Sequence, residues 1–162
     1  LAPMEKGLSM GLLSDAGCPG IADPGAVMVK RAHAKNFIVK PLVGPSSILL
    51  AMMASGMNGQ SFAFNGYLPI DKQQRSRAIK RLEKHSGDYD QTQAFIETPY
   101  RNEQLLNDFI KTLSPTTQLS IACDLTLPTE WVKSAPIKQW KKIKVDLQKR
   151  PAIFLFHKEL AI

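Results

Sequence analysis

The sequence has few cysteines and no long apolar run. Cys18 and Cys123 are the two cysteines among 162 residues, too few and too far apart for a disulfide framework or a metal-binding cysteine motif. No apolar stretch approaches the ~20 residues that a membrane-spanning helix needs. The first residues, LAPMEKG, lack the basic and apolar regions of a secretory signal. We therefore expect a globular protein of the reducing cytoplasm.

Several catalytic signatures are also missing. The chain contains neither a G-x-x-x-x-G-K-[ST] phosphate loop nor a G-x-G-x-x-G run behind a strand pattern. The histidines His33, His85 and His157 lie far apart and form no recognisable grouping with serine and acidic residues. We expect neither a metal centre nor a serine-type catalytic triad.

Negative charge is scarce, and the positive excess is local. Lysine and arginine total 21 against 14 acidic residues, a net charge of +7. Residues 71–85 carry six basic and two acidic side chains, and residues 130–150 carry seven and two. Such runs are usually solvated faces, but they also suit an anionic partner such as nucleic acid.

The first third of the chain predicts alternating strands and helices. Residues 8–13 and 37–42 have strand patterns, and residues 25–35 and 46–56 have helical patterns. This βαβα order favours a parallel sheet with a ligand site at the carboxyl ends of its strands. The loops 14–25 and 43–46 follow the two predicted strands at those ends.

The pattern changes after about residue 57. Residues 61–69 predict a short strand and a turn, Asp71 and Gln74 predict the capped start of a helix, and residues 102–113 predict an amphipathic helix. Further strands are expected at 93–98, 118–123 and 151–157. We expect two α/β domains, residues 1–58 and 59–162, and LAPMEKG suggests that an N-terminal piece is missing.

The two loops of the first domain have residues suited to binding a ligand through the backbone. Gly17, Gly20 and Gly25 permit positive φ and close approach, and two prolines stiffen the path between them. Asp15 could accept hydrogen bonds from a ligand or from its own turn. Asp23 and the pair Ser46 and Ser47 are candidate helix caps, and the serines could also face a ligand.

Five motifs occur in order along most of the chain: SDAGCPGIADPG, PLVGPSS, FAFNGYLP, ETPYR and CDLTLPTEWV. Together they resemble the tetrapyrrole methylase superfamily, and within it the branch that 2′-O-methylates a cytidine of 16S ribosomal RNA. The resemblance implies S-adenosylmethionine as cofactor, a cleft between two α/β domains and a homodimer. Here it implies a partial N-terminal parallel-sheet domain and a complete C-terminal mixed-sheet domain.

The resemblance also implies the residues that contact the cofactor: Ser14, Asp15, Ala16, Gly17, Cys18, Ser46, Ser47, Thr98, Leu125 and Thr126. Three positions depart from the usual family pattern: Cys18 replaces Thr, Val43 replaces Pro and Leu127 replaces Lys. A ribose hydroxyl needs a proton acceptor to attack a methyl group, and Asp15 and Glu97 are the candidates. Arg101 could hold an RNA phosphate, or could pair with Glu97 to brace the turn.

Two other interpretations remain open from the sequence. The substrate could be a tetrapyrrole such as uroporphyrinogen III, although family members that modify tetrapyrroles more usually carry a GGDP-type loop in place of SDAGCPGIADPG. The chain could also be a non-catalytic RNA-binding domain. Our expectation is a small-subunit ribosomal RNA methyltransferase whose complete form is active and whose present segment alone is inactive.

Overall fold

The computed structural model describes residues 1–15 and 17–159. Their contacts divide the chain into an N-terminal unit, Leu1–Ser46, and a C-terminal unit, Ser47–Ile162. Each unit is described by itself. None of the helices among the described residues has the length and apolar character needed to span a bilayer. The predicted boundary between residues 58 and 59 concerns the domains of the complete protein, and it stays a prediction.

The N-terminal unit contains two helices, α1 (Ala2–Glu5) and α2 (Ala26–Ala34), and the second confirms the helix predicted over 25–35. The cap predicted for α2 is wrong: Gly25, and not Asp23, is the N-cap, and no side chain caps this end. The backbone of Gly25, at φ 142°, instead turns the chain into the helix.

The strands predicted at residues 8–13 and 37–42 are wrong, because neither segment forms a strand in the structure. A strand exists only when a second strand pairs with its backbone groups, and the described part of this unit supplies no partner. Most apolar side chains of these segments are therefore exposed, among them Leu8 at 62%, Leu13 at 92% and Leu42 at 90%. The expected parallel sheet is not formed by the described residues of this unit.

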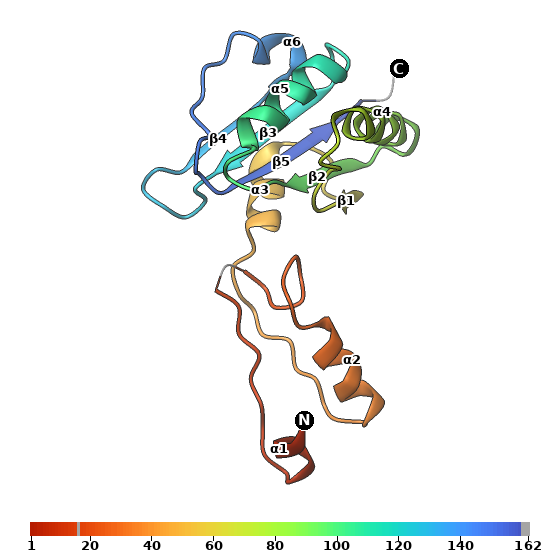
Figure 1. The fold of residues 1–162 in the computed structure, drawn as a ribbon, viewed down its shortest axis with the longest axis vertical. Helices are drawn as coiled ribbons and strands as arrows, with labels where there is room; N and C mark the ends of the chain where they lie inside the picture. Colours follow the sequence, from red (N-terminus) through yellow and green to blue (C-terminus); the bar gives the residue numbers. More distant parts are fainter. Residues whose placement is uncertain (16, 160–162) are drawn as a thin grey trace. The chain divides into compact units, whose positions relative to one another are not determined.

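The C-terminal unit contains a five-stranded mixed sheet, drawn in Figure 1. Its strands are β1 (Phe62–Phe64), β2 (Thr92–Ile96), β3 (Gln118–Cys123), β4 (Trp131–Pro136) and β5 (Ala152–His157). The strand order is β1-β2-β5-β3-β4, with β1 parallel to β2 and the other pairs antiparallel. The sequence predicted every strand except β4, and it predicted the mixed-sheet class.

Four helices cover this sheet. One face packs against α3 (Ser47–Ser55), and the other packs against α4 (Lys72–Tyr89), α5 (Asn102–Thr112) and α6 (Ile137–Trp140), as Figure 1 shows. Alternate side chains of β5 contribute to the hydrophobic cores on both faces of the sheet. Ile153 and Leu155 pack with α3, whereas Phe154 and Phe156 pack with Phe109 of α5. Successive side chains of a strand point to opposite faces, so one strand anchors both layers.

The helix boundaries follow from local chemistry that the sequence displays. The carboxylate of Asp71 accepts a hydrogen bond from the backbone N–H of Gln74 at 2.9 Å, which caps α4 as predicted. Gly56, directly after α3, has φ 71°, the left-handed conformation of a glycine that ends a helix. These caps fix where the helices lie along the sheet.

Candidate functional site

The glycine-rich loop of the N-terminal unit closes on itself through backbone contacts. Gly17, Gly20 and Gly25 all have positive φ, and the N–H of Gly20 donates to the carbonyl of Pro24 at 3.3 Å. A methyl group added at Gly25 would lie 2.7 Å from Cδ2 of Leu12 and 3.3 Å from the N atom of Gly20. Only glycine fits at position 25, so the conformation of this loop depends on one of the three glycines that the sequence analysis singled out.

The second loop of this unit touches the first. The thiol of Cys18 donates to the carbonyl oxygen of Pro45 at 3.5 Å, which joins residues 27 positions apart. The structure brings together the two loops that the sequence placed at one ligand site.

The predicted cofactor residues of the N-terminal unit differ in exposure. Asp15 is exposed, and Ser14, Gly17, Cys18 and Ser46 are partly exposed. Ser46 directly precedes α3, and the exposed Ser47 is the first residue of that helix, in the C-terminal unit. Ala16, also predicted to contact the cofactor, lies outside the described residues.

In the C-terminal unit, the turn after β2 is held by a carboxylate. Glu97 is 8% exposed, and its Oε1 accepts hydrogen bonds from the N–H of Thr98 at 2.7 Å and from Arg101 Nη2 at 2.6 Å and Nε at 3.2 Å. The structure thus contains the ion pair that was one of the two interpretations of Glu97 and Arg101. This network leaves the hydroxyl-bearing Thr98 exposed at the end of the strand.

Arg150 joins the loop after β3 to the loop before β5. Its Nε donates to Oδ2 of Asp124 at 2.7 Å, its Nη2 to the carbonyl of Thr129 at 2.7 Å, and its Nη1 to the carbonyl of Asp146 at 2.9 Å. The Thr129 hydroxyl donates to the same oxygen of Asp124 at 2.8 Å. One guanidinium therefore fixes two loops; we call this set of contacts the Arg150 clamp.

Electrostatics within the clamp favour its charged form. The hydrogen bond from Arg150, with a smaller contribution from Thr129, lowers the pKa of Asp124 although burial opposes the shift. The same bond raises the pKa of Arg150. Burial raises the pKa of the neighbouring Cys123 thiol, which makes this cysteine a packed side chain and not a reactive one.

The loop held by the clamp carries two predicted cofactor residues, Leu125 and Thr126. Leu125 is partly buried against the core under α3, and Thr126 is exposed. Thr126 has φ 70°, which is rare for a β-branched residue, and its N–H donates to Oε2 of Glu130 at 2.7 Å. The left-handed backbone of Thr126 is thus maintained by contacts at both ends of the loop.

Three hydrogen bonds join these loops at the end of the sheet. The N–H of Lys149 donates to the carbonyl of Pro99 at 3.2 Å. The side-chain amide of the fully buried Asn102 donates to the carbonyls of Arg150 at 2.7 Å and Leu147 at 3.3 Å. Sequence reasoning assigned no role to Asn102, Asp124 and Arg150, since their contacts are with residues distant in the sequence.

Most cations of the two basic segments are on the surface, with two exceptions. Arg75 is buried in an ion pair with Asp108, whose Oδ2 lies 2.6 Å from its Nη2. Arg150 is committed to the clamp. The exposed cations are Lys72, Arg77, Lys80, Arg81 and Lys84 in the first segment and Lys133, Lys138, Lys141, Lys142, Lys144 and Lys149 in the second.

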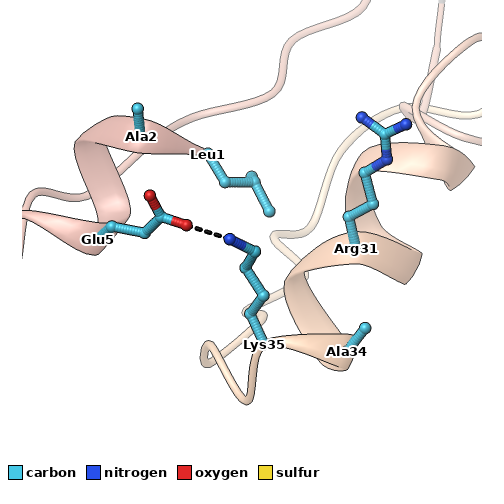
Figure 2. Close-up of a pocket in the computed structure, with 6 residues that line it drawn as sticks. All are labelled: Leu1, Ala2, Glu5, Arg31, Ala34 and Lys35. Atoms are coloured by element: carbon cyan, nitrogen blue, oxygen red, sulfur yellow. Dashed lines mark hydrogen bonds and ion pairs between the residues drawn. The ribbon is translucent and has the colours of Figure 1, made fainter.

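A hollow in the N-terminal unit lies apart from the predicted residues. It is lined by α1 and α2 residues, with an ion pair between Glu5 and Lys35, as Figure 2 shows. Its remaining lining residues are Leu1, Ala2, Arg31 and Ala34. Among the described residues, no three histidine, cysteine or acidic side chains gather in a way that could hold a metal ion.

Curated relatives resemble this chain along most of its length. Proteins named ribosomal RNA small subunit methyltransferase I are 32% identical over 155 residues in Vibrio cholerae and 34% identical over 142 residues in Buchnera aphidicola. The alignments cover 94% and 86% of this chain but 52% and 48% of those proteins. The chain thus spans about half the length of the curated relatives it matches. No family model matches the chain.

Solved structures share the fold. The methyltransferase CobJ has a TM-score of 0.56 and 16% identity, covering 88% of this chain and 62% of its own. The cobalt precorrin-4 methyltransferase CbiF has a TM-score of 0.54 and 16% identity, with 87% and 61% covered. At this identity the likeness concerns the fold alone, and it confirms the predicted fold class.

Proposed function

Because this chain belongs to the tetrapyrrole methylase superfamily, we propose that the complete protein is an S-adenosylmethionine-dependent methyltransferase that 2′-O-methylates a ribose of small-subunit ribosomal RNA. The observation that carries the proposal is the 32% identity over 94% of the chain to a protein named ribosomal RNA small subunit methyltransferase I. The order of the five motifs supports it, and so does the contact between Cys18 and Pro45 that joins two of them.

The residues present fit the proposed cofactor. Its ammonium, carboxylate and ribose hydroxyl groups need hydrogen-bonding partners, and the chain offers the exposed hydroxyls of Ser47, Thr98 and Thr126 at loop and helix ends. The glycine-rich loop adds backbone groups at positions where positive φ allows close approach. We propose that the ten residues predicted from the resemblance contact the cofactor in the complete protein.

Catalysis of such a methyl transfer depends mainly on aligning the two reactants. S-adenosylmethionine supplies a methyl group already activated by its sulfonium, so the protein must place the ribose oxygen in line with the carbon–sulfur bond. For the ribose oxygen to accept the methyl group, its hydroxyl proton would have to pass to an acceptor on the protein. We assign the acceptor role to Asp15, whose carboxylate is exposed.

Glu97 and Arg101 have a different role in this proposal. Oε1 of Glu97 already accepts three hydrogen bonds, so this carboxylate holds the turn that carries Thr98. Arg101, with a side chain 29% exposed, keeps part of its guanidinium available to an RNA phosphate.

The experiment uses the full-length protein and radiolabelled S-adenosylmethionine. Small ribosomal subunits that lack this methylation and uroporphyrinogen III are offered separately, with Asp15→Asn as the variant. We expect label in the RNA with the wild type and a strong loss with Asp15→Asn. Label in uroporphyrinogen III alone would favour the tetrapyrrole alternative, and RNA binding without S-adenosylmethionine binding would favour a non-catalytic RNA-binding protein.

We extend the proposal to a cytoplasmic homodimer. Support comes from the family resemblance and, for the compartment, from a ribosomal substrate. Light scattering of the full-length protein should give twice the mass of one chain, and a monomer mass that persists at high concentration would contradict the dimer.

A further inference from the structure

An exposed aromatic residue and an exposed lysine lie in two joined loops at the end of the sheet. Tyr100 is 78% exposed in the turn after β2, and Lys149 is exposed in the loop before β5. The two loops are joined there, because the N–H of Lys149 donates to the carbonyl of Pro99, the residue before Tyr100. Lys149 has φ 59°, a conformation that residues other than glycine seldom adopt, so its place is fixed by the fold.

This pair is connected to residues of the proposed reaction site. Tyr100 is two residues beyond Thr98, in the turn that Glu97 and Arg101 hold. Lys149 directly precedes Arg150, whose clamp holds the loop of Thr126. Tyr100 and Lys149 therefore lie on the same rigid set of loops as the residues we propose to contact the cofactor.

The charge around the pair suits a polyanion. Lys141, Lys142 and Lys144 are exposed in the same segment as Lys149. The segment 130–150 has two acidic residues, and the carboxylates of both accept backbone hydrogen bonds: Asp146 Oδ1 accepts from the N–H of Gln148 at 2.9 Å, and Glu130 Oε2 accepts from the N–H of Thr126 at 2.7 Å. A flat aromatic face with lysines beside it is how proteins bind unpaired nucleotides, by stacking on a base and contacting the backbone phosphates.

We propose that Tyr100 and Lys149 form a contact for an unpaired nucleotide of the RNA substrate, with the base stacked on Tyr100 and a neighbouring phosphate on Lys149. The proposal rests on the proposed function and deepens it, because it names the residues that would hold the RNA beside the reacting ribose. It predicts that the enzyme binds single-stranded RNA at this surface in preference to a duplex.

A matched control pair exists at the other end of β2. Tyr89 is 66% exposed just before this strand, and Lys80 is exposed on the same helix, α4. The ring of Tyr89 lies against His85, with centroids 4.5 Å apart, and Lys84 pairs with Asp88. This region is also aromatic and basic, but it is outside the loops of the proposed site.

The test measures binding of full-length protein to a short fluorescein-labelled pyrimidine RNA, single-stranded or paired to its complement, in the presence of S-adenosylhomocysteine. The variants are Tyr100→Ala, Tyr100→Phe and Lys149→Gln, with Tyr89→Ala and Lys80→Gln as controls. Tyr100→Ala should weaken binding at least about fivefold and Tyr100→Phe should retain wild-type affinity, because stacking needs the ring and not the hydroxyl. Lys149→Gln should reduce the salt dependence of log K by about 0.7, the value for one phosphate contact.

The outcomes separate this proposal from the proposed function. Calorimetry of S-adenosylhomocysteine binding and thermal melting should be unchanged in all five variants, which excludes unfolding as the cause of lost RNA binding. Wild-type RNA affinity in Tyr100→Ala, or an equal loss in Tyr89→Ala, would overturn the Tyr100 contact. If the wild type did not bind S-adenosylhomocysteine but its RNA binding still depended on Tyr100, the proposed methyltransferase function would be refuted and the proposed RNA contact would stand.

Discussion

The Arg150 clamp gives the prediction with the clearest magnitude. Arg150→Ala removes one charged hydrogen bond to Asp124 and two to the carbonyls of Thr129 and Asp146. Deleting a partner of a charged hydrogen bond costs about 1.5–3 kcal/mol, and exposure reduces this value because water replaces the lost partner. The side chains of Arg150 and Asp124 are 24% and 8% exposed. We therefore expect a loss of about 2–3 kcal/mol of unfolding free energy, between the values for surface and buried pairs.

The same substitution should weaken cofactor binding. If about 1.4 kcal/mol of the clamp energy serves to hold the loop of Leu125 and Thr126, affinity for S-adenosylhomocysteine falls about tenfold. Chemical denaturation gives the stability, calorimetry gives the affinity, and Arg150→Lys should recover only part of each because an ammonium cannot reproduce the planar fork. Lys142→Ala, at an exposed lysine of the same segment, is the control. Wild-type affinity and stability in Arg150→Ala would show that the clamp does not hold the loop.

The remaining predictions concern the clamp pH dependence, the glycine loop and one helix cap. Because the folded state lowers the pKa of Asp124 below its usual value of 3.8, the ionised carboxylate stabilises the fold above that pH, and this stabilisation is lost as the pH falls through the lowered pKa. The difference in unfolding free energy between wild type and Asp124→Asn, measured by denaturation at a series of pH values, should therefore be constant from neutral pH to about pH 5 and shrink below about pH 4. Gly25→Ala should destabilise the N-terminal loop by about 1–3 kcal/mol through backbone strain and the clash with Leu12, and proteolysis of this loop should become faster. Gly44→Ala is the control, because a methyl group there meets nothing within 4 Å, and its proteolysis should match that of the wild type. Asp71→Ala should cost about 1 kcal/mol by loss of the cap on α4, and an unchanged melting temperature would refute that assignment.

The sequence predicted the elements whose signals are local. Helix α5 was predicted because its apolar residues repeat at helical spacing, and α4 because Asp71 caps it, and both exist. Strand β4 was missed, since its residues Lys133 and Ser134 are exposed and its identity depends on pairing with β3. The segments 8–13 and 37–42 show the reverse case, where a strand pattern has no partner strand among the described residues of its unit.

The residues of the candidate site also differ in how far local sequence could predict them. Glu97 and Thr98 became candidates through the ETPYR motif and the resemblance, and the glycines of loop 14–25 because that residue type permits positive φ. Arg150 could not, since its role comes from three contacts with residues 4, 21 and 26 positions away along the chain. Local sequence indicates candidate ligand-binding residues more readily than it indicates residues that hold loops in place.

The most direct test of the central claim is the chemical position of the transferred methyl group. Full-length protein is incubated with S-adenosylmethionine carrying a labelled methyl group and with small ribosomal subunits that lack the modification, and the RNA is digested to nucleosides for mass spectrometry. The account predicts label on the ribose of one nucleoside, as a 2′-O-methyl group. Label on a base, or label that enters uroporphyrinogen III and not the RNA, would contradict it.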